Sequence, residues 1–242
     1  MDLTGRVALV TGAGRRVGQA IAEAIGAAGA RVAIHYHRSD AGAQALAQRL
    51  AGAVAFQADL RDAHAAQDLP GRVAADMGRL DILVNSASVM ERQVFGSVSP
   101  EEWDAVMQLN LRAYFFTAQG AAPELRRRHG QIVNISDMSA RQPWPGYLVH
   151  SASKAAVEHL TRGLAVVLAP EVRVNAVAPG AVLLPDAWGA ERREAIVRTT
   201  PLGRLGSPTD VAGAVRYLLG AEFTTGTTLT VDGGRYLMPR GE

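Results

Sequence analysis

Three glycines near the start of the chain have the type and spacing of a phosphate-binding turn. Gly12, Gly14 and Gly18 follow an apolar run at Val7–Val10 and open an amphipathic stretch. A strand that passes through glycines into a helix gathers backbone N–H groups and a positive helix dipole at one point, which suits a pyrophosphate. However, Val17 occupies the sixth place of a literal GxGxxG. An ordinary strand-to-helix turn also uses glycine for positive φ, so the glycines alone leave both interpretations open.

The side chains after the second predicted strand favour a nucleotide. An acidic residue that holds an unphosphorylated ribose is expected about 20 residues beyond the glycines. That neighbourhood instead contains His37, Arg38 and Ser39, which donate hydrogen bonds to phosphate. Asp40 is expected to cap a helix that begins at Ala41. The sequence therefore predicts a dinucleotide site biased toward NADP(H).

Apolar runs alternate with helical patterns along the whole chain. Strands are expected at Val7–Val10, Val32–Tyr36, Val54–Phe56, Ile82–Val84, Ile132–Ile135, Val172–Val177 and Thr228–Val231. Helices are expected at 15–28, 41–51, 62–77, 101–128, 149–168 and 208–219, with Pro70 and Gly71 interrupting the third and Pro123 kinking the long one. Strands that are apolar on both sides and separated by helices indicate a parallel sheet covered on both faces. We expect one domain over residues 1–242, a doubly wound α/β Rossmann fold with a seven-stranded parallel sheet.

The carboxyl ends of the strands in such a sheet are where ligands bind. The residues expected to line one cleft there are Thr11, Tyr36, Ala58, Asn85, Ser136 and Ala178. The stretch from Ala181 to Thr200 has weak periodicity and is expected to form a mobile lid over the cleft.

Composition excludes several other classes. The 242 residues contain no cysteine, which excludes disulfides, thiolate zinc sites and a cysteine nucleophile and fits a cytoplasmic setting. No metal site is expected. A net charge of +2 is too small to indicate binding to nucleic acid or to an anionic membrane. No apolar run approaches the length of a membrane span, and the N-terminus lacks the layout of a signal peptide.

Short motifs in order and spacing give the chain a resemblance to the short-chain dehydrogenase/reductase family over nearly its whole length. They are Thr11-Gly12 with Gly18, ADL at Ala58–Leu60, VNSAS at Val84–Ser88, Asn110, IVNIS at Ile132–Ser136, Lys154, RVNAVAPG at Arg173–Gly180, PLGRLG at Pro201–Gly206 and VDGG at Val231–Gly234. Within the family the chain looks most like pteridine reductases, because Arg16 stands where glycine is usual and because of the string HYHRS and Asp137.

The resemblance implies an NADP(H) site and roles for particular residues. Arg16 would add charge near the pyrophosphate, Asp59 would accept from the adenine amine or cap the following helix, and Lys154 would bind the nicotinamide ribose. The implied cofactor-binding residues are Gly12, Arg16, Val17, Gly18, His37, Arg38, Ser39, Asp59, Leu60, Asn85, Ser86, Ala87, Ser136, Lys154, Pro179, Gly180 and Val182.

The sequence departs from the family at the proton donor. The family has a tyrosine four residues before the lysine, and this chain has His150 there, with Asp137 at the serine position and Asn110 expected to support the proton path. A histidine in water has a pKa of about 6.5, against about 10 for tyrosine. His150 therefore either protonates the substrate or marks the loss of catalysis. The Lys154 ammonium opposes its charged form and the Asp137 carboxylate favours it, so the sequence leaves the net direction open. Tyr147, one helical turn earlier, does not have the required spacing.

Two functions remain open. One is an NADPH-dependent reductase that moves hydride to a C=O or C=N group, with a pterin or another flat heterocycle as one substrate class. The other is a catalytically silent NADP(H)-binding protein or sensor. The residues expected near a small-molecule substrate are Ser88, Met90, Trp144, Tyr147 and Trp188. On the predicted helices 101–128 and 149–168, apolar residues cover more than the one face that would pack on the sheet. The family resemblance implies that the additional apolar surface packs against other subunits in a homotetramer.

Overall fold

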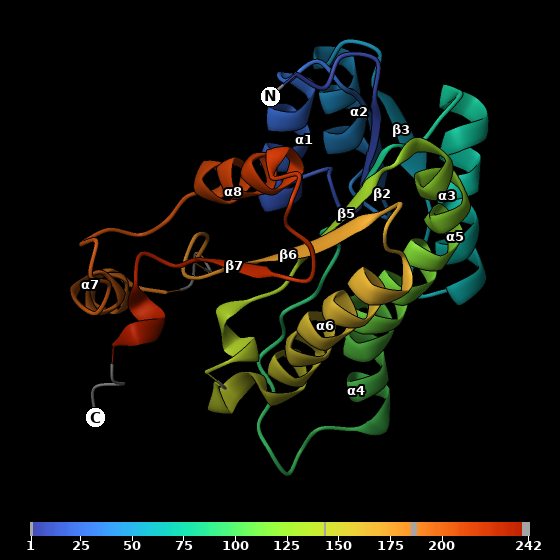
Figure 1. Cartoon of the computed structure of the whole chain (residues 1–242). Helices are drawn as coiled ribbons and strands as arrows, with labels where there is room; N and C mark the ends of the chain where they lie inside the picture. The colour runs from blue at the N-terminus through green and yellow to red at the C-terminus, as the bar shows by residue number, and fades with distance from the viewer. Residues whose placement is uncertain (1, 143, 185–187, 239–242) are drawn as a thin grey trace.

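The computed structural model describes residues 2–142, 144–184 and 188–238. In this part of the chain, seven parallel strands form one sheet in the order β3-β2-β1-β4-β5-β6-β7 (Figure 1). The strands are β1 (Val7–Val10), β2 (Arg31–Tyr36), β3 (Val54–Gln57), β4 (Ile82–Asn85), β5 (Gln131–Ile135), β6 (Arg173–Pro179) and β7 (Thr228–Val231). The seven-stranded parallel sheet expected from the sequence is confirmed.

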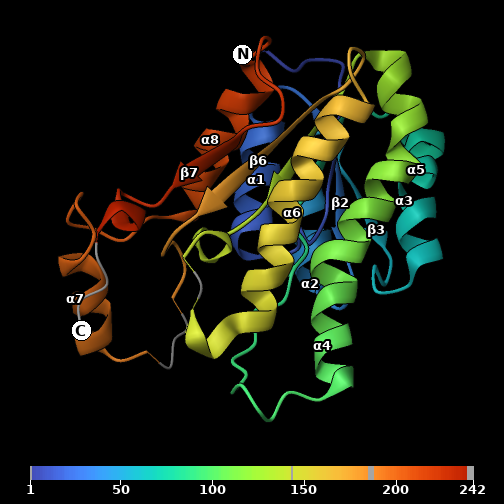
Figure 2. The ribbon, with the colours of Figure 1, turned by 60° about the horizontal axis from the view of Figure 1, so that its bottom comes forward.

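Helices cover both faces of this sheet, as Figures 1 and 2 show. They are α1 (Arg16–Gly26), α2 (Asp40–Arg49), α3 (Ala63–Met77), α4 (Pro100–Met107), α5 (Ala113–Arg128), α6 (Leu148–Val167), α7 (Ala190–Arg198) and α8 (Pro208–Gly220). Apolar residues of α1, α2 and α8 pack on one face, and those of α3, α5 and α6 pack on the other.

Strand β1 shows why the sheet is buried on both sides. Ala8 and Val10 join the core under α1 and α8, while Val7 and Leu9 join the core under α3 and α5. All four residues are fully buried. Because successive strand residues point to opposite faces, a run that is apolar at every position is what a doubly covered strand requires.

The expected interruption at Pro70 is wrong, because α3 runs through it. Pro70 removes one helical N–H bond, but the helix buries Leu69, Val73 and Met77 along the same side, and this packing outweighs the loss. Asp62 caps its N-terminus by accepting from the backbone N–H groups of His64 and Ala65.

The expected long helix over 101–128 is divided. α4 and α5 are joined by a π-helical turn at Gln108–Arg112, which contains the fully buried Asn110. Such turns accommodate one extra residue and are common at functional sites. α5 then continues through Pro123 to Arg128.

The segment expected to be a lid contains α7, which the weak periodicity had not indicated. Among the described residues, no helix has both the length and the apolar character needed to cross a bilayer.

Candidate active site

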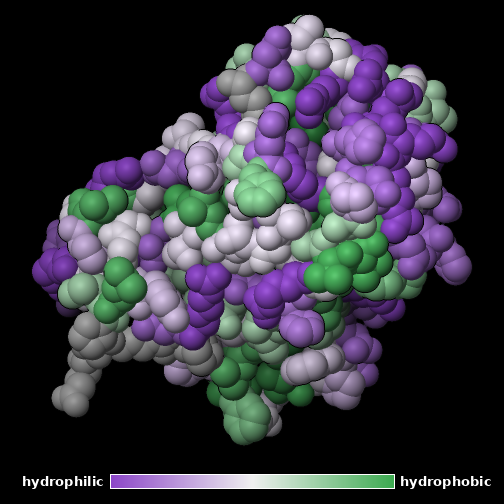
Figure 3. Space-filling model, viewed as in Figure 1, coloured by the Kyte–Doolittle hydropathy of each residue, from purple (hydrophilic) through white to green (hydrophobic). Residues whose placement is uncertain are grey.

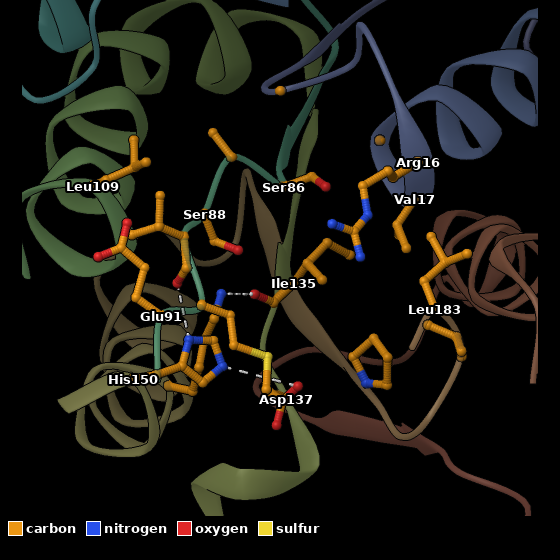
Figure 4. Close-up of a pocket in the computed structure, with 18 of the residues that line it drawn as sticks. Arg16, Val17, Ser86, Ser88, Glu91, Leu109, Ile135, Asp137, His150 and Leu183 are labelled. Carbon is orange, nitrogen blue, oxygen red and sulfur yellow. Dashed lines mark hydrogen bonds and ion pairs between the residues drawn. The ribbon is translucent and has the colours of Figure 1, made fainter. Parts of the chain in front are cut away.

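A cavity of about 1130 Å³ opens at the carboxyl ends of the strands (Figure 4). One end of its wall is formed by the residues that follow β2. The other end includes Trp188, which precedes α7, and Arg192, which lies within α7. A pocket for one drug-sized ligand measures about 300–1,000 Å³. The cavity therefore has room for a ligand larger than that, or for two ligands side by side.

Most residues singled out from the sequence lie on this wall. They are Gly12, Arg16, Val17, Gly18, His37, Arg38, Ser39, Asp59, Leu60, Ser86, Ala87, Ser88, Met90, Ser136, Asp137, Trp144, Tyr147, His150, Lys154, Pro179, Gly180, Val182 and Trp188. The expected residues that are not among the lining residues are Thr11, Ala58, Asn85, Asn110 and Ala178.

The glycine turn is held by a buried histidine that the sequence analysis did not select. Nδ1 of His35 accepts from the Gly12 amide at 3.0 Å, and its Nε2 contacts the Ala58 carbonyl at 3.1 Å. Gly12 has φ +66°, and a Cβ on it would lie 2.9 Å from the Cα of Ala87. A Cβ on Gly18 would collide with the Gly12 carbonyl. The turn therefore tolerates no side chain at either glycine.

The N-terminus of α1 faces the cavity without a side-chain cap. Arg15 occupies the cap position and makes no capping hydrogen bond. The first N–H groups of a helix have no partner within it, so those of α1 are donors for an anion. Arg16 begins the helix with φ +56°, a left-handed conformation that glycine adopts more easily. This explains in backbone terms why glycine would suit the position.

Several basic residues lie on the cavity wall. Within the part of the chain that the structure describes, Arg16 and Arg38 are exposed and form no hydrogen bond or ion pair. His37 Nε2 lies 3.6 Å from Asp59 Oδ2. Arg61 binds both oxygens of Asp59, and its hydrogen bonds lower the pKa of that carboxyl to about 2. Asp59 therefore stays ionised at neutral pH, close to His37 and Arg61.

Two expected helix caps are wrong. Asp62, and not Asp59, caps α3, because the Asp59 side chain turns back to the backbone and guanidinium of Arg61. Asp40 is the first residue of α2 and leaves the cap position to Ser39, which makes no side-chain capping bond. Asp40 still lies where the helix dipole favours an acid.

Asn85 faces away from the cavity, so its expected place in the cofactor channel is wrong. Its side chain is 1% exposed, donates to Asn134 Oδ1 at 3.0 Å and accepts from Thr117 at 2.8 Å. Asn134 in turn donates to Thr161. Asn85 therefore belongs to a buried network that ties β4 and β5 to α5 and α6.

His150 lies at the floor of the cavity with one ring nitrogen held by a carbonyl (Figure 4). Its Nδ1 is 3.1 Å from the Val89 carbonyl and 3.3 Å from Asn110 Nδ2. Asn110 Oδ1 accepts from the Val89 N–H. Asn110 Nδ2 donates to the Val89 carbonyl and to the Ser153 hydroxyl. Because both N–H groups of this amide are used, the consistent assignment has His150 Nδ1–H donating to Val89.

The other nitrogen of His150 faces Asp137. Nε2 is buried without a hydrogen-bond partner in the described structure and lies 4.0 Å from Asp137 Oδ2. Burial raises the pKa of Asp137, but His150 and the Ser139 groups lower it by more, so the net shift is downward. Nε2 of His150 and the Asp137 carboxylate face the same part of the cavity.

Lys154 is fully buried one turn further along α6. Its Nζ donates to the Ile135 carbonyl at 2.8 Å and lies 5.1 Å from the ring centre of Tyr114. Burial lowers the pKa of Lys154 to about 8, although Asp137 opposes this shift.

Aromatic side chains form the outer wall. The rings of Trp144 and Tyr147 meet edge to face with centres 6.0 Å apart, and the Arg192 guanidinium lies 3.6 Å from the Trp188 ring centre. Tyr147 precedes α6 and is not one turn earlier on it, so the expected helical relation to His150 is wrong. A 3₁₀ turn over Pro145–Tyr147 fixes its place.

Sequence reasoning missed His35, Arg61 and Tyr114 at this site. A histidine inside an apolar strand is typical of a buried core residue, so His35 was not selected. Arg61 contacts Asp59 only because the chain turns locally between them. The available signal was His35 itself, a titratable group in a strand that is otherwise apolar up to Tyr36.

Comparisons with known proteins agree with this geometry. Residues 12–235 match the family model described as enoyl-(acyl carrier protein) reductase. The chain is 38% identical over 240 residues to nodulation protein G of Rhizobium sp. (strain N33), covering 96% of this chain and 98% of that protein. It is 36% identical over 240 residues to the 3-oxoacyl-[acyl-carrier-protein] reductase FabG of Staphylococcus aureus (strain Mu50 / ATCC 700699), covering 95% and 98%.

A solved structure has the same fold. A dehydrogenase/reductase from Sinorhizobium meliloti 1021 superposes with a TM-score of 0.90 at 38% identity, covering 97% of this chain and 96% of that one. With its sheet order, glycine turn and buried lysine, this chain belongs to the short-chain dehydrogenase/reductase family of oxidoreductases.

Proposed function

We propose that the protein is an NADPH-dependent reductase that delivers hydride to a C=O or C=N group of a small molecule. The observation that carries the cofactor choice is Arg38, a cation without a partner among the described residues, next to His37 and Ser39 on the cavity wall. The nearest carboxylate on that wall, Asp59, is held by Arg61. A nucleotide with an additional phosphate fits this charge arrangement better than one without it.

The remaining cofactor site also fits a dinucleotide. The uncapped N-terminus of α1 suits a pyrophosphate, and the side-chain-free turn at Gly12 and Gly18 allows close approach of a ligand. The bound cofactor would supply the hydride. Lys154, whose Nζ donates to the Ile135 carbonyl, would bind ribose hydroxyls.

His150 would supply the proton. With Nδ1–H bound to Val89, neutral His150 carries no proton on Nε2, so donation from Nε2 requires the imidazolium form, which would face the Asp137 carboxylate. Asn110 would position the ring by fixing Val89. Met90, Trp144 and Tyr147 line the cavity, which is the support for a flat heterocycle such as a pterin as one substrate class.

Titration of NADPH and NADH tests the cofactor assignment. We expect NADPH to bind at least about tenfold more tightly, and Arg38→Ala to weaken NADPH by about 10–100-fold while leaving NADH unchanged. Arg128→Ala, an exposed arginine at the end of α5, is the matched control. Equal affinity for both nucleotides would disprove the proposal.

Turnover distinguishes the reductase from a silent NADP(H)-binding sensor. NADPH oxidation is measured with dihydropterins, quinones and simple ketones. Binding of NADPH without oxidation over all of these substrates would favour the sensor.

We also propose that the chain forms a homotetramer through the outer faces of α5 and α6. Phe115 is 42% exposed, and Val166 and Val167 are 79% and 65% exposed. Hydrophobic residues also gather where the loop between β4 and α4 reaches the surface at the bottom of Figure 3, with Phe95 84% exposed. Light scattering of the purified protein measures the mass, and a monomer would exclude the assembly.

A further inference from the structure

His35 joins three segments that are far apart in sequence. Its carbonyl accepts from the Ala13 amide at 2.9 Å, and its Nδ1 accepts from the Gly12 amide at 3.0 Å. Its Nε2 lies 3.1 Å from the carbonyl of Ala58, at the end of β3. The side chain is 2% exposed. One imidazole therefore links the glycine turn after β1 to the residues that precede Asp59.

The contacts of His35 allow one protonation state. A backbone amide can only donate and a carbonyl can only accept, so Nδ1 must be unprotonated and Nε2 must carry the hydrogen. A second proton on Nδ1 would remove the acceptor for Gly12. The charged groups that act on the ring are His37 and Arg72, which oppose protonation, and Asp59, which favours it. Burial is the largest influence and lowers the pKa of His35 to about 4.

The Gly12 amide is consequently not a donor for a ligand. It is used within the protein, and its bond to His35 sets the direction of the turn whose carbonyl packs against Gly18. Gly18 lies in the first turn of α1, whose free N–H groups face the cavity. A change at His35 would therefore reach the anion-binding end of α1 through Gly12.

We propose that His35 is a positioning residue of the dinucleotide site, which holds the glycine turn and the end of β3 in the relative placement that the cofactor requires. This inference rests on the proposed NADP(H) function. Both ring nitrogens of His35 are used by the backbone, so neither is available to bind the ligand.

Two substitutions separate the two bonds of His35. Asparagine places an acceptor where Nδ1 lies, so His35→Asn keeps an acceptor for Gly12 and loses the bond to Ala58. Glutamine extends its amide to the place of Nε2, so His35→Gln keeps a donor for Ala58 and loses the Gly12 bond. We expect His35→Gln to raise the Kd for NADPH at least about tenfold and His35→Asn to change it less than about threefold.

Stability and amide exchange are measured on the same variants. We expect similar urea midpoints for the two variants, and hydrogen exchange at the Gly12 amide that is fast in His35→Gln and protected in His35→Asn. The exposed His64→Gln on α3 controls for the substitution itself. Nitrogen-15 spectra of the wild type should show His35 with hydrogen on Nε2 alone at neutral pH.

The outcomes are distinct. Unchanged NADPH affinity in His35→Gln, or losses of affinity that follow the loss of stability equally in both variants, would overturn the inference. A wild type that does not bind NADPH would refute the proposed function, and the positioning role for a cofactor would fail with it. A wild type that binds NADPH while His35 carries hydrogen on Nδ1 would refute the inference alone.

Discussion

Nε2 of His150 lies 4.0 Å from Oδ2 of Asp137, while Nδ1 of the same ring is held by the Val89 carbonyl. The His150 side chain is 3% exposed and that of Asp137 is 17% exposed, so water screens the carboxylate from the imidazole only in part. This relationship places a carboxylate beside the ring nitrogen that faces the cavity.

Asp137→Asn should lower kcat/KM by about tenfold. The amide keeps the shape of the side chain but removes the carboxylate that lies 4.0 Å from Nε2 of His150, so the proton donor loses its charged neighbour. The NADPH dissociation constant should change little. Equal kcat/KM for the two proteins would exclude this role of Asp137.

His150→Phe should lower kcat by about 10²–10⁴-fold on every active substrate, because a general acid contributes on this scale. His150→Tyr restores the residue that the family has four positions before the lysine, and it should retain more activity than the phenylalanine variant. NADPH titration shows that both variants still bind cofactor. A fully active His150→Phe would show that the proton comes from elsewhere.

Lys154→Met should raise stability at neutral pH and weaken NADPH. The pKa of Lys154 falls from 10.5 in the unfolded chain to about 8 in the fold. The unfolded chain therefore binds the extra proton between pH 8 and 10.5, and wild-type stability rises with pH in that window.

Below pH 8 the buried ammonium costs on the order of 3 kcal/mol, which the methionine variant avoids. The Ile135 carbonyl keeps the Tyr114 hydroxyl as a donor. Urea unfolding at several pH values should show the advantage of the variant shrinking above pH 8. An advantage that grows with pH would contradict the assignment.

Arg16→Gly should stabilise the fold by about 1 kcal/mol or less while weakening NADPH binding. The left-handed φ of +56° costs a non-glycine residue about 1–2 kcal/mol, part of which the greater entropy of unfolded glycine cancels. Arg16→Ala is the control, because it removes the charge and keeps the backbone cost. If the glycine variant binds NADPH as tightly as wild type, the charge has no role at this position.

Asn85→Ala should lower the free energy of unfolding by about 1–3 kcal/mol, because Asn134 and Thr117 each lose a buried partner. Since Asn85 does not line the cavity, the NADPH dissociation constant should remain near the wild-type value. A loss of NADPH affinity with unchanged stability would restore the cofactor role expected from the sequence.

The strands were predictable because each is marked by a continuous run of apolar residues in the sequence. β1 and β7 have the bounds expected from the sequence, and β4 differs by one residue. The π-helical turn at Gln108–Arg112 was not predictable, because it depends on the contacts that Asn110 makes with a distant loop.

The candidate site was predictable in its membership and less so in its side-chain directions. Motif spacing brought Asp137 and His150 together as found. It did not show that Asn85 turns into the core, because the neighbouring strand, through Asn134, sets that direction. The same holds for His35, whose partners at Gly12 and Ala58 meet only in the folded sheet.

The single extra residue in the turn between α4 and α5 has a geometric consequence. One residue corresponds to about 100° of rotation in a helix, so deleting any residue of Gln108–Arg112 would either swing Asn110 away from Val89 or turn α4 about its own axis. Length at this point in the chain is thus as constrained as residue identity, and a shortened variant should lose catalysis even with every side chain of the cavity retained.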